Sequence, residues 1–248
     1  MLSVITRMTR FHLGQLLKTP FFLQTALLAP LSFGLLKWLG SAGAGVAVSD
    51  SLWVDTAVAG LWASTTTAVG IIGFQRFQGT LEHLAASVLS PGRVFGSLTA
   101  AAAALGLLSI PVGIAVQLLA TGSVRFSWAS LITILLAAIA CVASAGVLAS
   151  VFVLTRRATA FEPLLLMPVW LVSGVVIPAQ VLPEWLQALA WLHPLSGAVR
   201  VEHAETTFEA VAGAAGSLVA SLVWLVLANR LLSAATRRAR VEGTLALS

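Results

Sequence analysis

Six long stretches without a charged residue constrain the fold of this chain more than any other feature. A helix needs about 20 mostly apolar residues to cross the hydrocarbon core of a membrane. The third and fourth stretches are longer, but each is shorter than the roughly 40 residues that two crossings require. We therefore predict an all-α integral membrane protein with six transmembrane helices, at residues 20–39, 56–74, 95–120, 128–154, 161–178 and 209–231.

The composition agrees with a membrane protein and argues against a nucleic-acid partner. Hydrophobic residues make up 58% of the chain and charged residues only 9%, whereas an ordinary soluble domain has about 25% charged residues. The net charge of +5 comes from Lys and Arg in short loops between apolar stretches, not from one basic face of a soluble domain. The single cysteine, Cys141, lies inside an apolar stretch and excludes an internal disulfide.

Residues 1–18, "MLSVITRMTRFHLGQLLK", precede the first predicted span and are amphipathic. A helical projection places Val4, Met8 and Phe11 on one side and Arg7 and Arg10 on the other. A secretory signal would have its apolar core nearer the start and a small-residue cleavage site after it. The pattern predicts a helix that lies in the membrane interface.

The distribution of basic residues predicts the orientation, because short cytoplasmic loops retain Lys and Arg. With six spans and both termini in the cytoplasm, the outer side keeps only three basic residues, Lys37, Arg125 and Arg200. Residues 232–248 then form a cytoplasmic tail. We expect a multi-pass protein of a bacterial-type cell membrane.

One long polar segment, "FQRFQGTLEHLAASVLSPGRVF" at residues 74–95, interrupts the first half of the chain. A helix that starts at Thr80 would carry one apolar face, with Thr80 as its cap, Glu82 in its first turn and a stop at Ser90, Pro91 and Gly92. A helix resting on lipid headgroups and a helix that docks on a partner fit this pattern equally well. The apolar face consists of Leu81, Leu84, Ala85, Val88 and Leu89.

Two motifs carry a resemblance to a known family. The segment "RFQGTLEHLAASVLSPGRVFGSLTA", residues 76–100, resembles the intracellular loop of the type 2 family of ATP-binding-cassette (ABC) exporter permeases. The segment "LVSGVVIPAQVLPEWLQALAWLHPLSGAVRVEHA", residues 171–204, is similar to the stretch after that family's fifth span. The second match rests on Ser173, Gly174, Pro178, Leu182, Pro183, Trp185, Leu186, Pro194 and Leu195.

The first motif implies a coupling helix at residues 79–91, between spans 2 and 3, that sits in a cleft of an ATPase subunit. Gln75 and Gln78 stand where the family usually has acidic residues, so the charge pairing with the ATPase is expected to differ. The docking residues implied by the resemblance are Gly79, Thr80, Leu81, Glu82, Leu84, Ser90 and Pro91.

The second motif predicts a pair of short helices. Pro183 and Glu184 suit the start of a helix that runs to about Leu192, and Pro194 breaks the chain before a second short segment. Its apolar side chains make this region poorly suited to water. We predict re-entrant helices at residues 183–204 on the outer side, between spans 5 and 6.

The resemblance as a whole implies a single permease domain, residues 1–248, that is not itself an enzyme. The sequence contains no G-x-x-x-x-G-K-[ST] phosphate loop. ATP and Mg²⁺ would bind a separate ABC ATPase subunit, present in two copies. A second permease subunit, either a copy of this chain or a relative, would complete an efflux pathway for a hydrophobic or amphipathic drug, antibiotic or other natural product, including lipid-linked ones.

Two other classes of function stay open at this stage: a gradient-driven secondary transporter and a membrane-embedded enzyme or scaffold. Candidate substrate-pathway residues are Thr65, Thr66, Ser173 and Pro178. Ser and Thr in membrane helices commonly bond to backbone instead. The four histidines lack the spacing of metal ligands, and we expect no metal site.

Overall fold

The computed structural model describes residues 2–77, 79–155, 168–177 and 181–242, and these are helices joined by loops and turns. This confirms the all-α class for the described part of the chain. The helices are α1 (Leu2–Lys18), α2 (Pro20–Gly43), α3 (Leu52–Val69), α4 (Ile71–Phe77), α5 (Leu81–Ala85), α6 (Pro91–Gly106), α7 (Ser109–Thr121), α8 (Trp128–Leu154), α10 (Glu184–Ala190), α11 (Pro194–Glu202) and α12 (Thr207–Val241).

Five segments of the described chain are long and apolar enough to cross a membrane, which identifies an integral membrane protein. The sixth predicted span, 161–178, lies mostly outside the described residues; within it, residues 168–172 are helical. The number of crossings therefore stays a prediction. The five segments are Pro20–Gly43, Leu52–Gly73, Pro91–Thr121, Trp128–Leu154 and Thr207–Val241.

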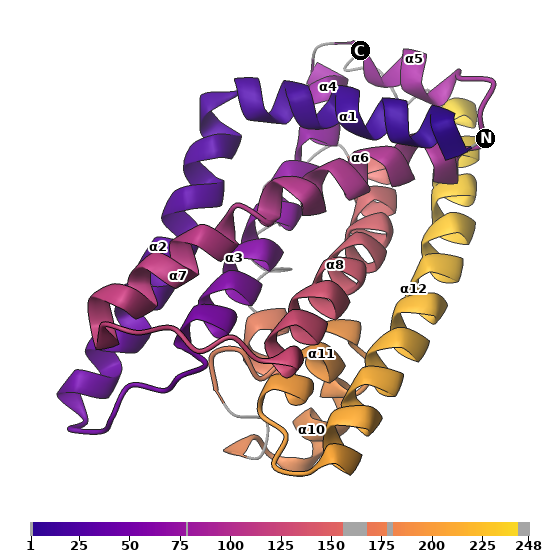
Figure 1. Ribbon diagram of the computed structural model, residues 1–248. Helices are drawn as coiled ribbons and strands as arrows, with labels where there is room; N and C mark the ends of the chain where they lie inside the picture. Colours follow the sequence, from indigo (N-terminus) through magenta and orange to yellow (C-terminus); the bar gives the residue numbers. More distant parts are fainter. Residues whose placement is uncertain (1, 78, 156–167, 178–180, 243–248) are drawn as a thin grey trace.

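The helices form a bundle around α3 (Figure 1). In the span Leu52–Gly73, which contains α3, 83% of the most apolar 18-residue stretch is buried inside the chain. The corresponding share is 22% for α2 and 17% for α12. Helix α1 lies across one end of the bundle, which also carries α5 and the C-terminal end of α12 (Figure 1). Helices α10 and α11 lie at the opposite end, so the two sequence motifs occupy opposite ends of the molecule.

The third predicted span, 95–120, is not one straight helix but the pair α6 and α7. Pro111 has no N–H to donate to the carbonyl of Leu107, so the regular hydrogen-bond ladder is interrupted there. The Ser109 hydroxyl donates to the carbonyls of Gly106 and Ala57, each at 2.6 Å. The break therefore lies against the backbone of α3, where its free carbonyls are partly satisfied.

Helix α12 continues well past residue 231, where the sixth span was predicted to end and a cytoplasmic tail to begin. The segment "SAATRRARV" is rich in Ala and Arg, which favour helix. Leu232, Ala235 and Ala239 recur on one face and are buried in the hydrophobic core. Burial of this face explains why residues 232–241 extend the helix instead of forming a separate tail.

Candidate functional site

The coupling segment, residues 79–91, contains a helix shorter than the predicted one. Helix α5 ends at Ala85. The Ser87 hydroxyl then accepts the Leu89 N–H at 3.2 Å, a local bond that competes with helix continuation. Thr80 occupies the N-cap position, but its hydroxyl donates to the Gln75 carbonyl at 3.1 Å and does not cap α5.

The side chains of the coupling segment divide into a buried set and an exposed set. Leu81 is 0% exposed and belongs to the chain's own core, with Leu84 packed against it. Val88, predicted on the same apolar face, is fully exposed because the helix has ended before it. Leu81 is thus unavailable to a partner protein, whereas Glu82, His83 and Val88 are accessible.

The coupling segment is connected to two of the long helices. Arg240 of α12 donates to the Ala85 carbonyl. On the preceding helix α4, Arg76 is 1% exposed and donates to the Val153 and Thr155 carbonyls at the end of α8. A displacement of the segment would therefore be transmitted to α8 and α12. Between the segment and α12 lies a hollow of about 380 Å³, lined by Ser87, Val88, Leu89, Ser90, Pro91, Ser233, Thr236, Arg237 and Arg240.

A polar cluster lies at the opposite end of the bundle, centred on the carboxylate of Asp55 in α3. Its side chain is 3% exposed and accepts hydrogen bonds from Lys37 Nζ of α2 at 2.5 Å and from His203 Nε2 at 2.9 Å. Ser51 Oγ donates to it at 3.4 Å. We call Lys37, Ser51, Asp55 and His203 the Asp55 cluster. It joins α2, α3 and the residue that follows α11.

The surroundings of the Asp55 cluster shift the protonation of two neighbours. The hydrogen bond to Asp55 raises the pKa of His203 above its ordinary 6.5, against the opposing effects of burial and of Lys37. Burial raises the pKa of Glu202, whose Oε1 accepts a hydrogen bond from Ser130 at 3.1 Å.

The shift of His203 predicts a pH dependence of stability. Because the folded pKa is raised, the stabilisation is fully present below about pH 6.5 and is lost as the pH rises through the folded pKa. As the pH rises from 6 to 9, we expect the melting temperature of the wild type to decrease more than that of His203→Gln. Thermal unfolding of both proteins in detergent measures this, and parallel pH profiles would contradict it. Lys37, Asp55 and Glu202 are the charged groups that face His203.

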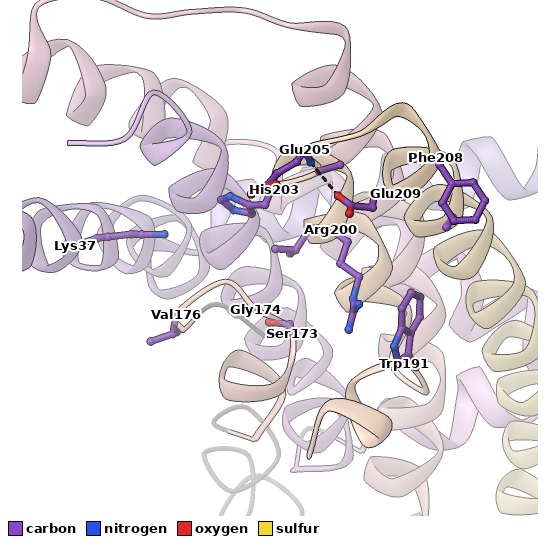
Figure 2. A pocket seen from close by; sticks show the side chains of 13 residues that line it. Lys37, Ser173, Gly174, Val176, Trp191, Arg200, His203, Glu205, Phe208 and Glu209 are labelled. Atoms are coloured by element: carbon purple, nitrogen blue, oxygen red, sulfur yellow. Dashed lines mark hydrogen bonds between the residues drawn. The ribbon is translucent and has the colours of Figure 1, made fainter. Parts of the chain in front are cut away.

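A cavity of about 620 Å³ adjoins the Asp55 cluster (Figure 2). The Arg200 guanidinium of α11 lies over the Trp191 ring, 3.8 Å from its centroid. Among the described residues, Arg200 Nε is buried without a hydrogen-bond partner. The cavity is lined by Lys37, Ser173, Gly174, Val176, Trp191, Val199, Arg200, His203, Ala204, Glu205, Phe208, Glu209 and Ala212.

The described candidates for the substrate pathway, Thr65, Thr66 and Ser173, lie in two places in the bundle. Thr65 and Thr66 are buried in α3, and their hydroxyls donate to the carbonyls of Leu61 at 2.6 Å and Trp62 at 2.8 Å in the same helix. Ser173 lines the cavity at the far end. Pro178 lies outside the described residues. The described part of the chain contains no group of three or more metal-ligating side chains.

The sequence offered little signal for the cavity and the Asp55 cluster. Lys37 and Asp55 marked the ends of two predicted spans, and Arg200 and His203 were expected in the second of the re-entrant helices at residues 183–204. The available hint was that Lys37 and Asp55 were predicted at the same depth in the membrane, where opposite charges usually pair.

A comparison with known protein families gives a match. The family model described as "ABC-2 type transporter" matches residues 5–201. No curated protein matches the chain. The matched range includes the whole coupling segment and α11 up to Val201.

Proposed function

The chain belongs to the ABC-2 type transporter family as a membrane permease, and from this premise we propose that it is the transmembrane subunit of an ATP-driven exporter. A separate ABC ATPase subunit, in two copies, binds ATP and Mg²⁺ and hydrolyses the ATP. A second permease, a copy of this chain or a relative, completes the pathway. The substrate is hydrophobic or amphipathic, of the kind found among drugs, antibiotics and lipid-linked natural products.

The observation that carries the proposal is the geometry of the coupling segment. It contains a short helix that buries Leu81 in the core and exposes Glu82 and His83, and Val88, after the helix, is exposed as well. Arg240 attaches its backbone to α12. An ATPase that grips the exposed side chains would therefore move α12, and through α4 and Arg76 it would move α8.

The charge distribution supports a cytoplasmic position for this end. Basic residues concentrate in α1, in the coupling region and at the C-terminal end of α12, as the preference of Lys and Arg for the cytoplasmic side requires. The cavity and the Asp55 cluster then face the outer side, and the pair α10 and α11 forms the proposed re-entrant element there. The basic residues at the coupling end are Arg7, Arg10, Lys18, Arg76, Arg93, Arg237, Arg238 and Arg240.

The poor burial of α2 and α12 supports a partner within the membrane. Only 22% and 17% of their apolar windows are buried inside the chain. Lipid and a second permease are the two surroundings that suit such faces. Tilting of two permeases against each other would open the pathway alternately to the two sides.

Two substitutions at the coupling segment test the proposal. We expect Glu82→Lys and Val88→Asp each to reduce transport and the yield of co-purified ATPase by about tenfold or more, the size of a hot-spot loss at an interface. Both side chains are exposed, so insertion and folding should not change. Leu81→Asp is unsuitable, because Leu81 is a core residue.

Glu184→Lys is the matched control, since Glu184 is an exposed acidic residue at the opposite end of the bundle. Transport and ATPase co-purification should be unaffected by this change. If the protein instead purifies alone and is active without an ATPase, a gradient-driven transporter or a membrane enzyme would replace the proposal.

A further inference from the structure

The cavity beside α11 has the size and the charge arrangement of a ligand site. Its volume of about 620 Å³ lies within the roughly 300–1,000 Å³ of small-molecule sites in proteins. Helix α11, which lines it, lies at the opposite end of the bundle from α5 (Figure 1), so docking of an ATPase at the coupling segment does not account for the cavity. Its wall carries both positively and negatively charged side chains, and the negatively charged ones are more exposed to solvent than Lys37 and Arg200.

The inner positive charge is Arg200. Its guanidinium lies flat against Trp191, and no Asp or Glu of the described residues lies within ion-pair distance of it. Its Nε atom is buried without a hydrogen-bond partner among those residues. A buried donor without a partner is unfavourable, and the planar fork of arginine matches a phosphate or carboxylate group. An anionic group in the cavity would pair with the guanidinium that lines it.

The other cations of the cavity wall are already compensated. Lys37 Nζ is 2.5 Å from the Asp55 carboxylate and also donates to the Val175 carbonyl at 3.3 Å. His203 bonds to the second oxygen of Asp55. Arg200 is therefore the group of this wall that is free to take an anion.

The outer part of the cavity is acidic. Glu205 and Glu209 are exposed and line the cavity. Glu209 is held at the start of α12, because its Oε2 accepts the Glu205 N–H at 3.0 Å and its own N–H is bonded to Thr206 Oγ1 at 3.2 Å (Figure 2). Neither carboxylate forms an ion pair with a described residue. A ligand with its anion at Arg200 would therefore meet negative charge further out.

Exposed apolar side chains flank this site. Phe208 is 81% exposed, Trp191 45% and Val176 40%. Tryptophan gathers where the membrane meets water, and Trp185 on the adjacent α10 is also exposed. These side chains would suit contact with the acyl chains of a bilayer leaflet.

We propose that this cavity binds a zwitterionic amphiphile, with a phosphate or carboxylate on Arg200, a primary ammonium at Glu205 and Glu209, and an apolar chain along Phe208. Only the assignment of the site to the outer leaflet rests on the proposed function. Binding itself requires no ATPase, so it is measured on the isolated full chain, and a failure there is separate from a failure of coupling.

Native mass spectrometry of the purified chain, titrated with short-chain lipids, tests the site. Dioctanoyl phosphatidylethanolamine should bind about fivefold or more tightly than dioctanoyl phosphatidylcholine, whose quaternary ammonium cannot donate a hydrogen bond to a carboxylate. Arg200→Gln should weaken binding of the ethanolamine lipid about tenfold, as expected for loss of a charge-assisted pair. The affinity of Arg200→Lys for the ethanolamine lipid should lie between those of the wild type and Arg200→Gln, since lysine keeps the charge but lacks the planar fork.

Two further variants make the test specific. Glu205→Gln should reduce the preference for the ethanolamine lipid over phosphatidylcholine and leave dioctanoyl phosphatidylglycerol binding unchanged or stronger. Arg125→Gln is the matched control: Arg125 is at the same end, is exposed and pairs with Asp50, and is no part of the cavity wall. Thermal unfolding of each variant verifies folding.

Three results would overturn the proposal. If a folded Arg200→Gln variant bound the ethanolamine lipid as tightly as the wild type does, Arg200 would not be the anion site. Equal losses in Arg125→Gln and Arg200→Gln would indicate general attraction between charges. Glycerophosphoethanolamine, the headgroup without acyl chains, binding as tightly as the lipid would exclude an amphiphile as the ligand.

Discussion

Asp55→Ala is expected to destabilise the protein by about 2–3 kcal/mol, less than the loss of one partner from a fully buried ion pair, because Lys37 and His203 keep partial access to solvent. Its carboxylate is 3% exposed and is shared by Lys37 and His203. Its loss leaves Lys37 with the Val175 carbonyl but without its carboxylate partner, and it releases His203 from α3. Thermal unfolding in detergent measures the change, with the loss of soluble protein as the readout.

Two comparisons separate this effect from a general loss of charge. Asp50→Ala breaks the exposed pair with Arg125, whose side chains are 59% and 81% exposed, and should cost less than about 1 kcal/mol. Lys37→Met combined with Asp55→Leu should recover part of the stability, since an apolar pair of similar volume removes the unpaired charge. If Asp55→Ala were as mild as Asp50→Ala, the Asp55 cluster would not hold the end of the bundle together.

The positions of the long helices could be predicted from the sequence because the bilayer imposes a simple rule. Helix α8 covers 128–154, the same residues as the predicted fourth span, and Ser127 caps it by accepting the Ser130 N–H. The rule does not indicate where a span bends. Pro111 was visible in the sequence, but the break appears at Leu107 and Leu108 because the carbonyl one turn earlier loses its donor.

The coupling segment shows a second limit of pattern reasoning. The periodicity placed Leu81 and Val88 on one face, which assumes a helix of at least two turns. The side-chain bond of Ser87 is local, and the close approach of Arg240 belongs to the tertiary structure. Both accompany the end of α5 at Ala85. Leu81 and Val88, predicted on one face, therefore have different surroundings: Leu81 is buried in the core and Val88 is exposed.

The candidate site at the other end depended on distant contacts. Asp55 and His203 are separated by 148 positions in the chain, and Lys37 and Asp55 by 18. Each charge alone looked like the end of a span or part of a re-entrant helix. Only the packing of α11 on α3 and α12 brings Arg200, His203 and Glu209 to one cavity.

That packing depends on a close crossing of α11 and α12, which leads to the second large effect. A Cβ atom on Gly197 would lie 2.6 Å from the Ser217 nitrogen and 2.7 Å from the Gly213 carbonyl oxygen, both backbone atoms of α12. Gly213 and Ser217 stand one turn apart, so small residues on both helices permit the contact. A side chain at Gly197 must therefore push the two helices apart.

We expect Gly197→Ala to destabilise the protein by about 1–3 kcal/mol through overpacking, although Ala is by itself the better helix former. Gly96→Ala is the matched control: Gly96 lies in α6 and its added Cβ meets nothing within 4 Å. There the helix propensity acts alone and should add up to about 1 kcal/mol of stability. Thermal unfolding should therefore shift in opposite directions for the two variants. Shifts of the same sign would mean that the crossing adapts, and that α11 is less firmly held than the close contact requires.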